Sequence, residues 1–331
     1  MVLDSPAPAK SRPLEPRDVP VPEPAPGEVL VKVRACGVCR TDLHVVEGEL
    51  PDPKLPLVPG HQVVGTVDRV GEGVEEPAVG DRVGVPWLGG TDGTCPYCRH
   101  GHENLCERPS FTGYLRDGGY AEYVTARADF VLPLAEDYPD LQTAPLLCAG
   151  VIGYRALRLT DIEELDGPPR LGLYGFGASA HIVAQVARHL GHDVFVCTRS
   201  ERTQQFAREL GARWVGGTDE PPPVELDAAI IFAPAGSLVP PALSAVRRGG
   251  TVVCAGIHMS PIPELPYELL WGERVLRSVA NLTRTDGHEF VKLAPRFRIQ
   301  TKVREFPLEE ANEALEQLKS GGLQGAAVLV P

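Results

Sequence analysis

Residues 171–180 read LGLYGFGASA, a short apolar run that leads directly into a glycine-rich turn. A strand, a G-x-G-x-x-G/A turn and a helix in this order are typical of dinucleotide-binding sheets. In this pattern the first glycine permits the tight turn, the second lets a pyrophosphate approach the backbone, and N–H groups at the helix start bind the phosphates. A plain glycine-rich turn is the alternative. The residues predicted to contact a dinucleotide are Gly175, Phe176, Gly177, Ala178, Ser179 and Ala180.

The chain downstream of this turn alternates between helices and apolar strands. The pattern predicts, in chain order, a helix over 178–190, a strand over 193–197, a helix over 201–210 with Ser200 as its N-cap, a strand over 227–232, a helix around 238–247 and a strand over 251–255. Continuous apolar strands that alternate with helices indicate a parallel sheet covered on both faces. A doubly wound α/β domain is therefore expected here.

The end of the second strand indicates which nicotinamide cofactor is preferred. An acidic residue there would bind the ribose 2′-hydroxyl and repel a 2′-phosphate. The sequence instead has Thr198, Arg199 and Ser200, with Arg202 as a second basic candidate. Hydroxyls beside a guanidinium suit a phosphate, so the pattern favours NADP(H) over NAD(H). A solvated helix start is the alternative.

Upstream of residue 146 the chain has a different pattern. Short alternating strands, for example over 29–33, 63–67 and 82–85, are separated by Gly and Pro, which predicts an all-β barrel or sandwich-like domain. The C-terminal stretch has a helical pattern over 308–318 between two short strands and looks too small to fold alone. The predicted organisation is a first domain over 1–149, a dinucleotide-binding domain over 150–283, and a segment over 284–331 that returns to the first domain.

Composition excludes several classes of function. The 331 residues carry a formal net charge of −12, which argues against a general binder of nucleic acids or anionic membranes. No apolar run is long enough to span a bilayer, and the Pro-rich first residues lack the apolar core of a signal peptide. A cytoplasmic location is therefore expected, where regularly spaced cysteines more often bind metal or take part in catalysis than form disulfides.

Two sets of metal-ligating residue types stand out. Cys39, His61 and Cys148 are far apart in the sequence, and spacing alone does not connect them. Each could be a small core residue or a structural histidine, although a Cys-Cys-His zinc site with one open position suits alcohol oxidation. The second set is local and reads as a zinc-binding lobe: Asp92, Cys95, Cys98 and Cys106. A disulfide with one odd cysteine is the alternative for this lobe.

These motifs together resemble the zinc-containing alcohol dehydrogenases of the medium-chain dehydrogenase/reductase superfamily. The resemblance runs from about Pro24 to the C-terminus. It rests on the motifs GVCRTDLH at 37–44, PGH at 59–61, CAG at 148–150, the cysteine lobe and the glycine turn at 175. It implies that the first domain is a GroES-like β-barrel that carries the zinc, and that the C-terminal segment completes this barrel.

The resemblance also implies roles for single residues. Cys39, His61 and Cys148 match the three ligands of the catalytic zinc. Thr41 matches the hydroxyl that takes the alcohol proton, and His44 the residue that relays it through the cofactor ribose to solvent. Asp42 matches the carboxylate that orients the histidine ligand, and Arg40 a basic residue that reaches the cofactor pyrophosphate. The substrate pocket is matched by Trp87, by Tyr114 more weakly, and by Ile152 beside the nicotinamide.

Some positions depart from the family pattern. Gln62 stands where a glutamate usually follows the histidine ligand, so ligand exchange at the zinc is expected to differ. Asp92 replaces the first of four cysteines in the lobe, with His100 and His102 as substitute ligands nearby, and a metal-free lobe is the alternative. His181 could contact the phosphates, but a position at the helix surface is expected.

The overall expectation is a zinc-dependent alcohol dehydrogenase or aldehyde reductase that uses a nicotinamide cofactor and acts on a primary, or secondary, alcohol. The alternatives are a polyol dehydrogenase, which usually has Glu in place of Cys148, a zinc-free quinone or enone reductase, and a non-catalytic protein that keeps the fold. A homodimer or homotetramer is expected, with no nucleic-acid or membrane partner.

Overall fold

The computed structural model describes residues 1–163, 167–323 and 325–331, and the chain divides into two compact units. Unit 1 comprises Met1–Cys148, Asn281–Pro295 and Gln300–Pro331, and unit 2 comprises Ala149–Ala280 and Arg296–Ile299. The chain returns to unit 1 at Asn281, and the last residue of helix α8, Arg296, and the three residues that follow it belong to unit 2.

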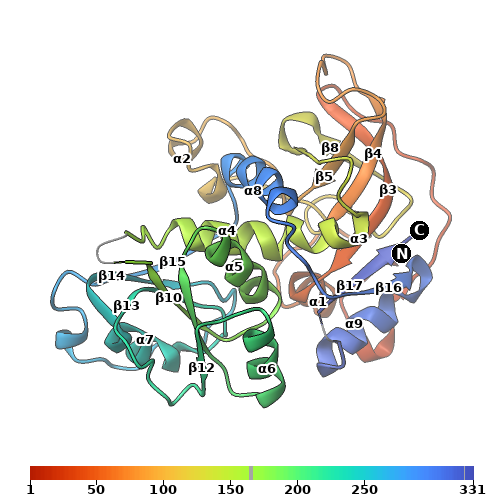
Figure 1. Ribbon diagram of the computed structural model, residues 1–331. Helices are drawn as coiled ribbons and strands as arrows, with labels where there is room; N and C mark the ends of the chain where they lie inside the picture. The colour runs from red at the N-terminus through yellow and green to blue at the C-terminus, as the bar shows by residue number, and fades with distance from the viewer. Residues whose placement is uncertain (164–166, 324) are drawn as a thin grey trace. The chain divides into compact units, whose positions relative to one another are not determined.

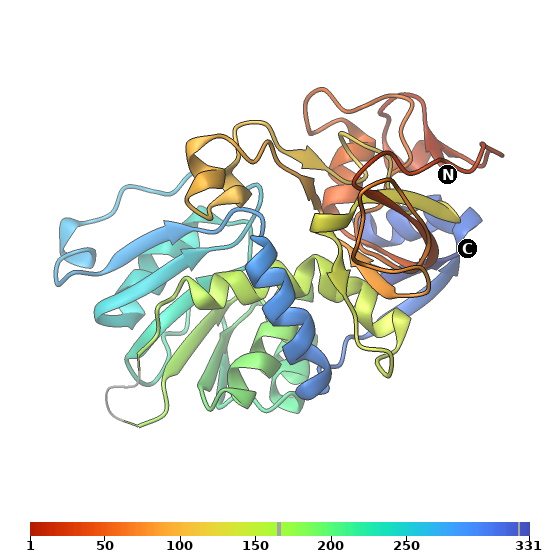
Figure 2. The ribbon, with the colours of Figure 1, turned by 90° about the horizontal axis from the view of Figure 1, so that it is seen from above.

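Unit 1 is built around the long strand β3 (Glu28–Val38). Its apolar residues are buried, whereas Lys32 and Arg34 point outward, as expected of a strand with one face on a core. β3 pairs antiparallel with three other strands: β4 (Val63–Val70), β8 (Tyr123–Arg127) and β17 (Ala326–Val330). In Figures 1 and 2 the blue C-terminal strands accordingly lie beside the red and orange strands of the N-terminal region.

The complete sheet of unit 1 has the strand order β16-β17-β3-β4-β5-β9, with β8 paired to β3. The other elements of this unit are β1 (Val2–Leu3), β2 (Leu14–Glu15), α1 (Arg40–Glu47), β5 (Arg82–Val85), β6 (Leu88–Gly90), α2 (Pro96–Arg99), β7 (Ser110–Phe111), β9 (Leu132–Pro133), α3 (Asp140–Thr143), α8 (Arg284–Arg296, all but its last residue), β16 (Val303–Pro307) and α9 (Ala311–Ser320). A buried apolar core lies inside this curled sheet and includes Val31, Val63 and Val83.

Unit 2 contains a six-stranded parallel sheet with the order β12-β11-β10-β13-β14-β15. This order reverses beside β10, as in a doubly wound dinucleotide-binding fold, and the expected fold class is confirmed. The elements of this unit are α4 (Ala149–Arg158), β10 (Arg170–Tyr174), α5 (Ala178–His189), β11 (Asp193–Cys197), α6 (Glu201–Glu209), β12 (Trp214–Gly216), β13 (Leu226–Ile231), α7 (Val239–Ala245), β14 (Val246–Cys254) and β15 (Val275–Ser278).

In unit 2 most predicted bounds agree with the structure to within two residues, and the start of strand β14 is the clearest difference. Helix α7 ends at Ala245, and β14 begins at once at Val246 instead of at residue 251. Val246 is fully buried, so its apolar side chain supports a strand that then crosses the exposed Arg248 and Gly249. Within the described ranges, no helix has the length and apolar character needed to cross a bilayer.

Candidate functional site

Three residues that are distant in sequence meet in unit 1. Cys39 follows the end of β3, His61 precedes β4, and Cys148 follows the 3-10 helix Ala144–Leu147. The Cys39 sulfur lies 3.3 Å from Nε2 of His61 and 3.9 Å from the Cys148 sulfur, and all three donor atoms lie within 4.8 Å of one another. We call these three residues the buried site; His61 is fully buried, and Cys39 and Cys148 are half-buried.

The donor set of the buried site fits a tetrahedral divalent cation. Two sulfurs bound at zinc distances and tetrahedral angles would be about 3.8 Å apart, close to the 3.9 Å observed. Two thiols and one imidazole are the ligand types that zinc prefers, and three protein ligands leave one position for a substrate or water. The residues present therefore fit a catalytic zinc ion.

Helix α1 orients this site. Cys39 is the N-cap of α1, where its sulfur accepts a hydrogen bond from the Thr41 N–H at 3.3 Å. One carboxylate oxygen of Asp42 accepts the Cys39 backbone N–H at 2.8 Å, and the other accepts Nδ1–H of His61 at 2.9 Å. Asp42 is almost fully buried and connects two of the three ligands. This arrangement leaves Nε2 of His61 as the ligand atom.

The electrostatics of the buried site depend on these close contacts. The hydrogen bond with Cys148 and burial both raise the pKa of the Cys39 thiol well above its ordinary value. Burial alone would lower the pKa of His61, but the Asp42 carboxylate and Cys39 outweigh it and raise the pKa to about 10. A metal ion therefore has to displace protons from this site when it binds.

An aromatic cluster lies against the buried site. Trp87 packs edge-on to the His61 ring at 5.0 Å, and it stacks on Tyr114 at 5.8 Å and on Phe111 at 4.8 Å. Phe111 and Tyr114 are only 6.4 Å apart, which is too close for them to lie on opposite faces of the indole. Trp87 and Tyr114 were candidates from the sequence, whereas Phe111 was missed because nothing in its spacing connects it to them.

The remaining predicted residues of unit 1 lie on or next to α1. Thr41 is buried and His44 is half-buried, three positions further along the same helix. The Nδ1 atom of His44 donates a hydrogen bond to the Glu49 carboxylate, a contact that sequence reasoning missed. Arg40 is exposed at the first position of the helix. Gln62 is 2% exposed, and its side chain packs against Gly37 on β3.

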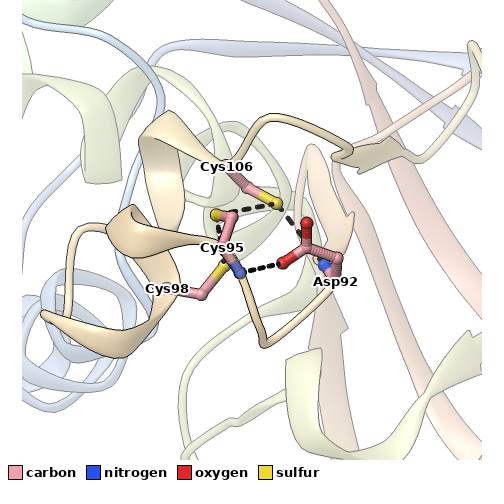
Figure 3. A group of neighbouring side chains, drawn as sticks. All are labelled: Asp92, Cys95, Cys98 and Cys106. Atoms are coloured by element: carbon pink, nitrogen blue, oxygen red, sulfur yellow. Dashed lines mark hydrogen bonds between the residues drawn. The ribbon is translucent and has the colours of Figure 1, made fainter.

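A second cluster, the lobe, lies between β6 and β7. Figure 3 shows three sulfurs and one carboxylate that point toward a common centre, from Asp92, Cys95, Cys98 and Cys106. The Cys95 sulfur is 3.5 Å from that of Cys98 and 3.9 Å from that of Cys106, without a disulfide. These distances match the edges of a tetrahedral sulfur-bound site.

The aspartate of the lobe is held in place by the loop itself. One oxygen of Asp92 accepts the backbone N–H groups of Thr94 at 2.8 Å and Cys95 at 2.9 Å. These hydrogen bonds, with the Arg108 guanidinium, hold the pKa of Asp92 well below its usual range. His100, a possible substitute ligand, is exposed, and its Nδ1 contacts the carbonyl of Pro96. His102 is also exposed and lies outside the four-residue donor group.

The glycine-rich turn of unit 2 joins β10 to α5. Gly175 has a φ of +84°, and a Cβ there would lie 2.9 Å from the backbone of Ala233, so only glycine fits. Gly177 is the N-cap of α5, and a Cβ there would meet no protein atom within 4 Å. Ala180 is fully buried against the sheet, whereas Ala178 is exposed. This open, glycine-lined helix start fits a dinucleotide pyrophosphate.

The end of strand β11 and the start of helix α6 carry the residues that are predicted to select NADP(H) over NAD(H). Thr198 is buried at the end of β11, and Arg199, Ser200 and Arg202 are exposed at the start of α6. Ser200 is the N-cap of α6, but its side chain makes no capping hydrogen bond. Ile152 is half-buried in α4.

The expected surface position of His181 is wrong. This residue is only 4% exposed, Nδ1 lies 3.1 Å from the Gly177 carbonyl oxygen, and the ring packs 5.7 Å from Phe206. Phe206 comes from α6, so the residue that covers His181 could not be identified from the pattern of its own helix.

Comparisons with known proteins agree on one family. Residues 25–136 match the alcohol dehydrogenase GroES-like domain. A probable alcohol dehydrogenase of Mycobacterium tuberculosis is 50% identical over 98% of this chain and 95% of its own length. The alcohol dehydrogenase of the archaeon Aeropyrum pernix is 30% identical, with a TM-score of 0.84 over 96% of this chain and 97% of that chain. A cobalt- and zinc-bound thermostable alcohol dehydrogenase of Pyrobaculum aerophilum is 25% identical, with a TM-score of 0.87 over 100% of this chain and 98% of that chain.

Proposed function

Since this chain belongs to the medium-chain alcohol dehydrogenases, and is thus an NAD(P)-dependent oxidoreductase, we propose that it interconverts small primary alcohols and aldehydes with a zinc ion and NADP(H). The proposed zinc dependence rests on one observation: the donor atoms of Cys39, His61 and Cys148 lie close together, and Asp42 accepts a hydrogen bond from His61. The Pyrobaculum aerophilum relative is described as zinc-bound, which supports the same metal here.

Zinc, when bound, supplies Lewis-acid polarisation of a substrate oxygen, and the nicotinamide supplies the hydride acceptor or donor. When the metal binds, the two ligand sulfurs would be thiolates and His61 would be neutral at Nε2. Asp42 contributes by accepting Nδ1–H of His61, which fixes the ring and its tautomer. The N-terminus of α1 contributes by directing the Thr41 N–H toward the Cys39 sulfur.

The proton that alcohol oxidation releases requires an acceptor in unit 1. Thr41 offers a buried hydroxyl one position after the start of α1, and His44 lies on the same face of the helix three residues later. We assign Thr41 to the alcohol proton and His44 to its transfer to solvent. His44 is only partly buried, so its ring has access to water.

Cofactor binding is proposed at the carboxyl ends of β10 and β11. Within unit 2 the turn at 175–180 would contact the pyrophosphate, whereas Thr198, Arg199, Ser200 and Arg202 would contact a ribose phosphate. Exposed basic and hydroxyl groups at the end of β11 support NADP(H) over NAD(H). Replacing Arg199 with Ala is expected to lower the preference for NADPH over NADH by about tenfold, the equivalent of one charge-assisted contact. Arg213→Ala is the matched control, because Arg213 pairs with Asp193 at the opposite end of β11.

The lobe is proposed to bind a second, structural zinc through Asp92, Cys95, Cys98 and Cys106. A carboxylate can replace a thiolate as a zinc ligand. The two backbone N–H groups that bond to Asp92 fix its carboxylate beside the three sulfurs. These contacts support Asp92 as a zinc ligand in place of a cysteine.

The aromatic cluster and the surface of unit 2 complete the proposal. Trp87, next to His61, is proposed to form a wall of the substrate pocket together with Tyr114, which would restrict the substrate to small alcohols. We further propose a cytoplasmic homodimer or homotetramer. β15 lies at the edge of its sheet, and Tyr267 and Trp271 nearby are 68% and 66% exposed.

The decisive experiment is a set of initial rates with a panel of alcohols, aldehydes, polyols and quinones, each with NADPH and with NADH or their oxidised forms. Metal content of the same preparation should be measured by elemental analysis. Two zinc ions per chain and the highest kcat/KM with a small aldehyde and NADPH are expected. Activity confined to quinones, or full turnover by metal-free protein, would contradict the proposal.

A further inference from the structure

The C-terminal end of α1 has an unusual polar contact. Helices that end on a left-handed glycine often form a Schellman motif, in which two N–H groups bond back to the last carbonyls. Here Gly48 has a φ of +75°, its N–H donates to the Val45 carbonyl oxygen at 3.2 Å, and the Glu49 N–H donates to that of His44 at 2.9 Å. Both hydrogen bonds of the motif are present.

The motif places the side chains of His44 and Glu49 side by side. Two apolar residues usually make contact at these two positions. In this chain Nδ1 of His44 instead donates to a carboxylate oxygen of Glu49, so the same two residues are joined by a backbone and a side-chain hydrogen bond. The His44 side chain is 18% exposed and that of Glu49 is 51% exposed, which puts this hydrogen bond at the boundary with solvent.

We propose that Glu49 is a positioning residue for proton transfer by His44, an inference that rests on the proposed function. By accepting Nδ1–H, the carboxylate selects the neutral tautomer in which Nε2 carries the lone pair. Nε2 then takes the proton released by alcohol oxidation, and the same proton leaves for bulk buffer, which restores the neutral ring. The Glu49 carboxylate stabilises the transient imidazolium by charge.

Glu49→Leu tests the proposal, because leucine restores the apolar contact that is usual in this motif. If Glu49 only stabilised the helix end, E49L would retain both stability and activity. We expect unchanged thermal unfolding but about tenfold lower kcat for alcohol oxidation in dilute buffer. Glu49→Asp, which keeps the charge, should recover part of the loss. At constant pH and ionic strength, an increasing concentration of N-methylmorpholine buffer should restore the kcat of E49L and leave that of the wild type unchanged.

Glu47→Gln is the matched control. Glu47 lies on the same helix but bonds to the Ala9 N–H and to Lys319, so its loss should lower stability without creating a dependence on buffer. In holoenzyme labelled with ¹⁵N-histidine, NMR should show Nδ1–H at His44 in the wild type and a mixture of tautomers in E49L. Full, buffer-independent activity of E49L, or an unchanged tautomer, overturns the role of Glu49. A wild-type enzyme without alcohol oxidation but with the expected tautomer change would instead refute the proposed function.

Discussion

The buried site and the lobe bring similar ligands together by opposite means. The two sulfurs of the buried site come from residues 109 positions apart, whereas the outermost ligands of the lobe are separated by only 14. The buried site is oriented by β3, α1 and the carboxylate of Asp42. The lobe is a loop whose only regular elements are the four-residue helix α2 and the 3-10 helix Glu103–Leu105.

This difference separates two roles of a metal ion. The elements around the buried site pack on an apolar core of their own, so its geometry does not depend on an ion to form. The lobe buries Cys95, Cys106 and the polar residues Glu103 and Asn104, but its larger apolar side chains, those of Pro96, Tyr97 and Leu105, are exposed. A small loop without a core usually needs a metal or disulfides to keep its structure. We therefore expect loss of the first ion to affect chemistry and loss of the second to affect stability.

The largest effect is expected from breaking the buried site. His61→Ala or Cys39→Ala should lower kcat/KM by at least about 10³-fold, which corresponds to roughly 4 kcal/mol of transition-state stabilisation. The metal content should fall by one equivalent, with a circular dichroism spectrum like that of the wild type. Unaltered turnover in either variant would remove the catalytic zinc from the mechanism.

Asp42→Asn should weaken metal binding at the buried site without removing a ligand. The amide cannot accept from both the Cys39 N–H and Nδ1–H of His61 as the two carboxylate oxygens do. Loss of such a supporting carboxylate typically costs 10- to 100-fold in metal affinity. Competition with a chromogenic chelator measures the change, and Asp92→Asn is the control that should leave this site unaffected. Equal metal affinity in D42N and wild type would contradict the assigned role.

Substitutions of Asp92 test whether the metal of the lobe affects stability rather than catalysis. Asp92→Ala removes a ligand and the acceptor of two backbone N–H groups, so we expect about 1–2 kcal/mol lower stability and faster proteolysis between residues 92 and 106. Asp92→Cys restores four sulfurs and should slow release of the metal to a chelator. Both variants should retain wild-type kcat in freshly prepared protein. A large loss of kcat with normal stability would show that the lobe takes part in catalysis.

The smallest effect is expected at Arg108, which pairs with Asp92 at 3.3 Å while its side chain remains 75% exposed. Exposed ion pairs of this kind contribute at most about 1 kcal/mol and are screened by salt. Arg108→Ala should change the melting temperature only slightly, and the difference should vanish at high ionic strength. A change as large as that of D92A would mean that Arg108, rather than a metal, holds the loop.

The sequence predicted the lobe and the buried site on different grounds. The spacing from Asp92 to Cys106 was sufficient for the lobe, because consecutive ligands in one loop can only lie near one another. The buried site could be proposed only through resemblance to a family, because pairing of β3 with β4 brings the segments around Cys39 and His61 into contact. Strand pairing between such distant segments leaves no local signal in the sequence.

The residues that were missed or misplaced depend on neighbours from other elements. Phe111 joins the aromatic cluster from β7, and His181 is covered by Phe206 from α6. Neither contact has a local periodicity that could have been read in advance. Glu49 is a different case, because a carboxylate directly after the glycine that ends α1 was a visible departure from the usual apolar pattern.

Strand β17 has a consequence for how the protein is made. It pairs with residues 36–38, immediately before the first ligand, Cys39, yet residues 39–325 are synthesised between the two segments. In the nascent polypeptide, residues 36–38 of β3 therefore lack this partner until β17 has been synthesised. A chaperone that shields this edge would raise the yield of active enzyme, and products truncated before β17 would aggregate instead of acquiring metal.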